Sequence, residues 1–152
     1  MIAECLVGFR DSDLGGEPTA VEDLTSYGSD AAWVTKSSHE LQEIVDLARA
    51  APIGMSVPAE RKLPLQEARA ATLRGDPDPR WDDAISSLRA LGEPHWLATG
   101  LLEQAEWLVD QGRSDEAAPL LGEARETFER LRATPSLARI DAIAERVGTA
   151  TA

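Results

Sequence analysis

Three carboxylate side chains share one face of a helix predicted over residues 95–111. Glu103, Glu106 and Asp110 are spaced i, i+3 and i+7, and residues at those intervals lie on the same side of an α-helix. Such a row can attract a cationic segment electrostatically. We call these three residues the acidic stripe. The sequence leaves two interpretations open: a solvated face with no ligand, or part of a groove for a basic, amphipathic peptide.

Residues 11–22, DSDLGGEPTAVE, approach the spacing of a twelve-residue calcium loop. Four positions match it: Asp11, Asp13, Gly16 and Glu22. Gly15 offers no side-chain ligand at the fifth position, so we interpret the segment as a capped acidic turn and expect no metal site.

Other reactive residues are few and scattered. His39 and His95 both fall near predicted helix starts, with no base, nucleophile or metal partner beside them in the sequence. The single cysteine, Cys5, excludes an internal disulfide and a thiolate zinc site. No glycine-rich phosphate loop, HExxH or GxSxG motif occurs. We therefore expect no catalytic residues, no cofactor and no enzymatic activity.

The charge of the chain limits its partners. Its 152 residues carry a net charge of -12. Binding to nucleic-acid phosphates takes clustered Lys and Arg, so neither nucleic acid nor an anionic membrane surface is an expected partner. No apolar run reaches the roughly 20 residues that span a bilayer, and the first basic residue is Arg10, which leaves no basic start of a secretory signal. We expect a cytoplasmic protein with a basic or amphipathic protein or peptide partner.

Hydrophobic periodicity predicts an all-α domain over residues 38–152. Helices are expected over 39–50, 64–74, 81–91, 95–111, 115–132 and 136–147. Ser38 and Ser114 are placed as N-caps, Pro52 and Gly54 end the first of these helices, and Pro119 predicts a kink or a late helix start. We expect residues 1–37 to form an irregular or weakly helical segment, with short helices near 2–10 and 18–26.

Two pairs of predicted helices repeat one pattern. The corresponding residues are Ala84 with Ala117, Leu88 with Leu121, Ala70 with Ala105, and Leu73 with Leu108. The shifts of 33 and 35 residues give a period near 34, which is typical of the tetratricopeptide repeat. The fold expected is a short right-handed α-solenoid with hairpins at 64–91 and 95–131; an ordinary helical bundle is the alternative.

Residue sizes within the second hairpin suit close helix packing. Small residues that let two backbones approach are Ala105, Ala117 and Ala124; large residues that fill the space between are Leu101, Leu108, Leu121 and Phe128. The four tryptophans, Trp33, Trp81, Trp96 and Trp107, are expected mostly in the core, although Trp33 falls in the irregular segment and could lie exposed.

Three motifs carry a wider resemblance: LGEPHWLA (91–98), GRSDEAAPLL (112–121) and FERLRATPSLAR (128–139). With them, residues 39–147 resemble the C-terminal repeat region of large actinobacterial regulators. Those proteins combine a cyclase-type or DNA-binding module, a signalling ATPase and a tetratricopeptide array. Their catalytic and nucleotide-binding modules have no counterpart here, so the resemblance implies only a scaffold role.

The resemblance also implies where a partner binds, because the first helix of each tetratricopeptide hairpin lines a concave groove. The residues that this geometry places there are Glu67, Thr99, Leu102, Glu103, Glu106, Val109 and Asp110. We therefore expect a non-enzymatic protein–protein interaction module, with a second copy available to cover an open end of the array. The alternative is a regulatory or sensor fragment of a larger nucleotide-handling signalling protein.

Overall fold

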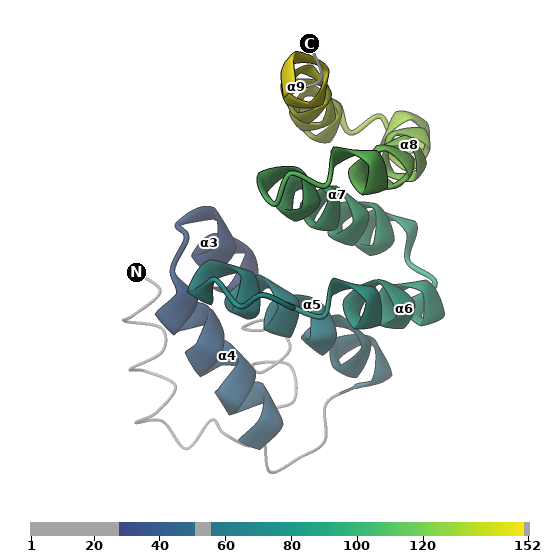
Figure 1. The fold of residues 1–152 in the computed structure, drawn as a ribbon. Coiled ribbons are helices and arrows are strands. Elements are labelled where there is room, and N and C mark those ends of the chain that lie inside the picture. Colours follow the sequence, from purple (N-terminus) through teal and green to yellow (C-terminus); the bar gives the residue numbers. More distant parts are fainter. Residues whose placement is uncertain (1–27, 51–55, 151–152) are drawn as a thin grey trace. The chain divides into compact units, whose positions relative to one another are not determined.

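The computed structural model describes residues 28–50 and 56–150, and the regular structure within these ranges is helical, with no strand (Figure 1). The helices are α3 (Ser29–Val34), α4 (Ser38–Ala50), α5 (Val57–Arg74), α6 (Trp81–Leu91), α7 (Pro94–Asp110), α8 (Ser114–Leu131) and α9 (Thr134–Ala150). The all-α prediction is confirmed. Cys5, the acidic turn at 11–22, the helices predicted near 2–10 and 18–26, and the helix end predicted at Pro52 and Gly54 lie outside the described residues.

The chain divides into two compact units between Leu91 and Gly92. In the first unit α4 packs on α5, α5 packs on α6, and α3 contacts both α4 and α5. In the second unit α8 lies against α7 and α9, and α9 also contacts α7. The predicted hairpins correspond to the packed pairs α5–α6 and α7–α8. None of the described helices is long and apolar enough to cross a membrane.

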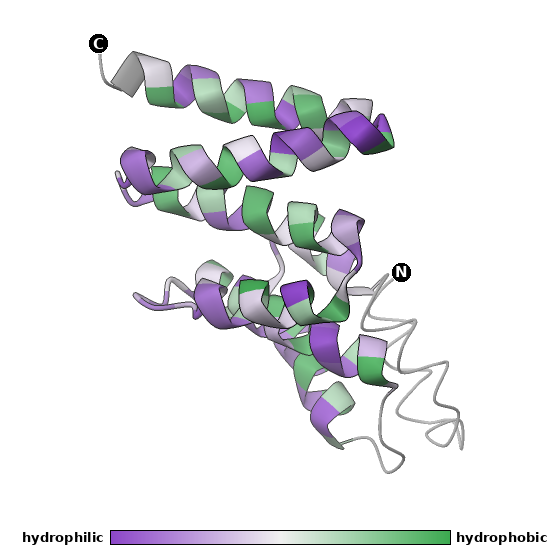
Figure 2. Ribbon diagram, turned by 90° about the vertical axis from the view of Figure 1, so that its right-hand side faces the viewer, coloured by the Kyte–Doolittle hydropathy of each residue, from purple (hydrophilic) through white to green (hydrophobic). Residues whose placement is uncertain are grey.

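Helix α4 buries the apolar stripe predicted for it. Leu41, Ile44, Val45 and Ala48 are buried, and Figure 2 shows how polar and apolar residues alternate along the helices. Helix α4 begins one residue earlier than the N-cap predicted at Ser38 implied. Ser38 is its first helical residue, and the Ser37 hydroxyl accepts the N–H of Glu40 at 3.4 Å. Two consecutive serines both fit the capping pattern, so the sequence could not separate them.

Helix α5 begins seven residues earlier than predicted. The Ser56 hydroxyl caps it by accepting the N–H of Ala59, and Pro58 lies in the first turn, where its missing N–H costs nothing. Pro64 is therefore interior rather than initial. An interior proline removes one backbone hydrogen bond. The burial of Ala59, Leu65 and further residues along α5 offsets that loss.

Helix α8 also continues through a proline. It runs from Ser114 to Leu131 with Pro119 inside, so the predicted late start is wrong. Ser114 is not the N-cap either, because Arg113 occupies that position and makes no side-chain cap bond. Instead, Nε and Nη2 of Arg113 donate to Oε1 and Oε2 of Glu116, both at 2.7 Å. A bidentate pair thus fixes the first turn of α8.

The small and large residues of the α7–α8 pair pack as predicted. Ala105, Ala117 and Ala124 are fully buried, and Leu101, Leu108, Leu121 and Phe128 are buried around them. Helix α7 ends in a turn at Gly112, whose φ of 75° is a conformation that glycine adopts without strain. The sequence thus places the contact between these two helices correctly.

Aromatic packing joins α3 to α6. Trp33 is 6% exposed, so the exposed alternative left open for it is wrong. Its ring meets that of Trp81 edge-on, with centroids 6.5 Å apart. Trp81 Nε1 donates to Thr72 Oγ1 at 3.1 Å. Trp96 and Trp107 are half-buried.

Candidate functional site

Two of the predicted groove residues on α7 are buried. Leu102 and Glu103 are each 2% exposed. A partner segment cannot reach side chains at that depth without a rearrangement of the helices. The open part of the predicted groove on α7 is therefore smaller than the sequence indicated.

The other two members of the acidic stripe are paired with arginines of the same chain. Arg139 Nη2 donates to Glu106 Oε2, and Arg146 Nη2 donates to Asp110 Oδ1. Both arginines belong to α9. The expected basic partner of these two carboxylates is thus supplied from within the second unit.

The remaining predicted groove residues on α7, Thr99 and Val109, contribute little to a binding face. Thr99 is half-buried, and its hydroxyl donates to the backbone carbonyl of His95 at 2.9 Å. Val109 is half-buried. Neither residue adds a charge or a free hydrogen-bonding group to the face that Glu106 and Asp110 share.

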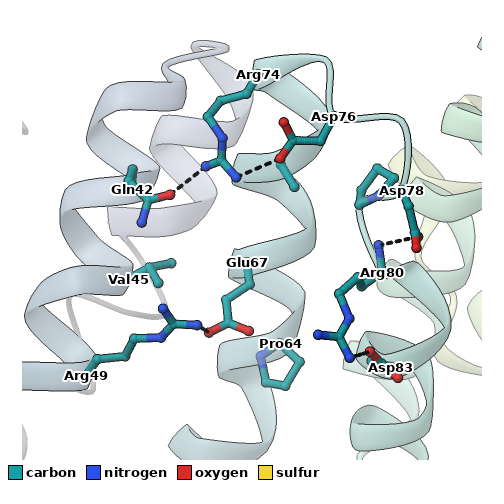
Figure 3. Close-up of a pocket in the computed structure, with 12 residues that line it drawn as sticks. Gln42, Val45, Arg49, Pro64, Glu67, Arg74, Asp76, Asp78, Arg80 and Asp83 are labelled. Atoms are coloured by element: carbon teal, nitrogen blue, oxygen red, sulfur yellow. Dashed lines mark hydrogen bonds and ion pairs between the residues drawn. The ribbon is translucent and has the colours of Figure 1, made fainter.

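Glu67, the seventh predicted residue, lies in the first unit and lines a hollow of about 620 Å³. Figure 3 shows the hollow between α4, α5, the turn that follows α5, and α6. The lining residues are Gln42, Val45, Arg49, Pro64, Glu67, Ala71, Arg74, Asp76, Asp78, Pro79, Arg80 and Asp83. We call it the charged hollow, because three of these residues are arginines and four are acidic.

Each arginine of the hollow pairs with one of its carboxylates, and one of these pairs joins two helices (Figure 3). Arg49 Nη2 donates to Glu67 Oε1 at 2.5 Å, which links α4 to α5. Arg74 donates to Gln42 Oε1 at 2.5 Å and to Asp76 Oδ2 at 2.8 Å. These side chains stay at the surface: the Arg49 side chain is 59% exposed and that of Arg74 41%.

The turn between α5 and α6 supplies further residues that line the charged hollow. Gly75, with φ of 77°, ends α5, and Pro77 and Pro79 stiffen the GDPDPR turn. Within it the backbone N–H of Arg80 donates to Asp78 Oδ1 at 3.2 Å. The Arg80 guanidinium pairs with Asp83 on α6 at 2.5 Å.

The two histidines belong to different units. His39 Nδ1 lies 3.6 Å from Glu43 Oε2 on α4. His95 contacts the rings of Trp96 and Phe128 edge-on. Within the described ranges no group of three or more metal-ligating side chains occurs.

Most of the charged hollow was missed by sequence reasoning, which selected only Glu67. The acidic residues of the GDPDPR turn were not connected with Arg49 or Arg74. The sequence did offer one signal for the hollow. Asp and Pro alternate in the GDPDPR turn, and the prolines hold the acidic residues at fixed positions. Comparison of the chain with protein-family models, with curated proteins and with solved structures finds no match.

Proposed function

We propose that this chain is a non-enzymatic protein-interaction module of tetratricopeptide-like hairpins, and that the charged hollow binds a segment of a partner protein. The observation that carries the proposal is the set of exposed arginine–carboxylate pairs in the wall of the hollow. Exposed pairs of this kind contribute only about 0–1 kcal/mol each. A partner's charges can therefore replace one member of a pair at little cost.

The composition of the wall favours a peptide over a small effector. Sites for small molecules enclose most of the ligand and are lined mainly by apolar side chains. The hollow instead presents seven charged residues and one amide, with few apolar neighbours such as Val45 and Ala71. The alternative, an effector-binding fragment of a nucleotide-handling regulator, requires a more enclosed lining than this one.

Helix spacing in the second unit supports a repeat array. The pairs Glu106–Arg139 and Asp110–Arg146 join residues 33 and 36 apart in sequence. The residue with the higher number on α7 pairs with the residue with the higher number on α9, so the two helices run in the same direction. Equivalent first helices of successive tetratricopeptide repeats have this relation, with a period of about 34 residues.

The charges of the hollow indicate the character of the partner. Carboxylates outnumber guanidinium groups there by four to three, and the chain as a whole carries -12. A segment with both signs of charge and a basic excess is complementary to this surface. Long-range attraction from the acidic chain speeds its approach, and the local pattern of signs sets its register.

Selection from a random peptide library tests the proposal. The wild-type chain is panned, and the enriched peptides are measured against a variant in which one pair is exchanged, Arg49→Glu with Glu67→Arg. This exchange keeps the net charge and the pair but reverses its direction. The matched control exchanges a pair outside the hollow, Arg113→Glu with Glu116→Arg, whose side chains lie 2.7 Å apart at the start of α8.

We expect peptides rich in basic residues that bind the control like wild type and the hollow variant at least tenfold more weakly. Peptides that bind all three proteins equally use another surface, and the hollow is then not the site. Enrichment of no peptide above background removes the proposal as a whole.

A further inference from the structure

Helix α9 packs on the face formed by α7 and α8, and its side chains indicate which kind of ligand that face accepts. We propose that this face is a second recognition surface, specific for an amphipathic helix with two arginines on the edge toward α7, and that α9 occupies it in the free chain. A partner helix of the same character binds by displacing α9. The proposal concerns the second unit and does not rest on the charged hollow.

The electrostatic part of the match is direct. Arg139 and Arg146 are seven residues apart and therefore lie on one side of α9, two turns from each other. They meet Glu106 and Asp110, which are one turn apart on α7. The α8 side carries the opposite charge, because Arg125 pairs with Asp141 of α9. A ligand helix thus needs a basic edge toward α7 and an acidic residue toward α8.

The apolar part lies between the two arginines. Ile140 and Ile143 are 1% and 2% exposed, and α9 contacts both α7 and α8. Their spacing of three residues places them on one face of the helix. The recognised pattern is therefore Arg-Ile-Asp-x-Ile-x-x-Arg, read from Arg139 to Arg146.

Helix α9 is held by few buried groups. Among its described side chains only Ile140 and Ile143 are fully buried, whereas α8 buries Ala117, Leu121, Ala124 and Phe128. Its ion pairs to α7 remain partly exposed: Arg146 and Asp110 are 50% and 55% exposed. Elements with few buried apolar contacts open at lower free energy than the rest of a fold.

The link between α8 and α9 is short and strained. α8 ends at Leu131 and α9 begins at Thr134, so Arg132 and Ala133 alone connect them. Arg132 has a φ of 56°, the left-handed conformation that residues with a Cβ adopt at a cost. The tethered helix competes with any outside ligand at high effective concentration.

Binding of a labelled synthetic peptide with the sequence of residues 134–150 tests the inference on the full chain. In the variant Arg139→Glu with Arg146→Glu, the chain's own α9 loses its pairs to α7. We expect fluorescence anisotropy to show at least tenfold tighter peptide binding to this variant than to wild type. The control is Arg130→Glu, a single charge reversal at a residue whose guanidinium donates to Thr127 on α8 itself; it should behave like wild type.

A peptide with the same two arginines replaced by glutamate should not bind the double variant. Equal binding of both peptides, or absence of binding by the native-sequence peptide, overturns the inference. If circular dichroism shows that the double variant has lost its helices, the single Arg146→Glu chain takes its place with the same expectation. Binding of library-selected peptides to the charged hollow is unaffected by either result.

Discussion

Arg69 is 2% exposed, and its Nη1 donates to Asp30 Oδ1 at 2.7 Å, across 39 residues of sequence. The same nitrogen donates to Gln66 Oε1 at 3.0 Å, and the guanidinium lies 5.7 Å from the centre of the Trp33 ring. A buried charge is costly unless it is paired. The pair therefore ties α3 to α5 and helps to order the first unit around the charged hollow.

Asp30→Ala removes one partner of the buried Arg69 guanidinium. The free energy of unfolding should fall by about 1–3 kcal/mol, because a buried donor loses its acceptor while its other contacts remain. Urea denaturation of the full chain measures the change. Asp46→Ala is the control: Asp46 is exposed on α4 and accepts from Gln42, so its loss should stay within about 0.5 kcal/mol. Equal effects of the two substitutions would mean that Asp30 is not a structural partner.

Ala117→Leu should destabilise the α7–α8 contact. Ala117 is fully buried, and three added carbons at a close helix approach cost about 1–3 kcal/mol. The neighbouring Ala118 is exposed on the same helix, so Ala118→Leu supplies a control with the same change in volume. Thermal denaturation compares the two. A melting temperature that falls equally in both variants would show that packing at Ala117 is not tight.

Leu102→Ala should act on stability. Although the sequence placed Leu102 in a binding groove, its 2% exposure makes the substitution a core truncation, which costs about 2–5 kcal/mol. Val109→Ala, at a half-buried position of the same helix, should cost less. Denaturant titration separates the two. A Leu102→Ala chain as stable as wild type would return this residue to the list of groove candidates.

The Arg113–Glu116 pair predicts a pH effect at the start of α8. The hydrogen bonds from Arg113 hold the pKa of the Glu116 carboxyl below its usual value, and the nearby positive charge adds to the effect. The stability that this contact contributes is present above the unfolded-state pKa and is lost as the pH falls through the lower folded-state pKa. Arg113→Ala should raise the pKa of Glu116 toward its usual value in a carboxyl NMR titration. An Arg130→Ala chain should keep it low, and an unchanged pKa in Arg113→Ala would contradict the assigned cause.

Local features were predictable from the sequence because they depend on neighbouring residues. The spacing of Ala105, Ala117 and Ala124 indicated a close helix contact, and all three are buried. Helix α6 was predicted with its observed bounds, and α7 begins and ends within one residue of the prediction. The start of α5 at Val57 was misjudged, because Pro64 was given more weight than the packing of the residues around it, and the late start considered for α8 at Pro119 does not occur.

Charge pairing was not predictable, because it depends on which helices pack together. The stripe of Glu103, Glu106 and Asp110 appeared as one uniform acidic face. In the structure Glu103 is buried, while Glu106 and Asp110 meet arginines more than 30 residues away in sequence. Charge periodicity along one helix does not specify the charges on the helix beside it.

Nuclear magnetic resonance of the arginine side chains tests the proposed function most directly. A chain labelled with ¹⁵N is titrated with a library-selected peptide, and the Nε–H signals of Arg49, Arg74 and Arg80 are followed. We expect these three signals to shift progressively and to saturate together, since the peptide exchanges partners with the carboxylates of the charged hollow. Saturable shifts confined to α7, α8 and α9, with the three arginine signals unmoved, would contradict the proposed function.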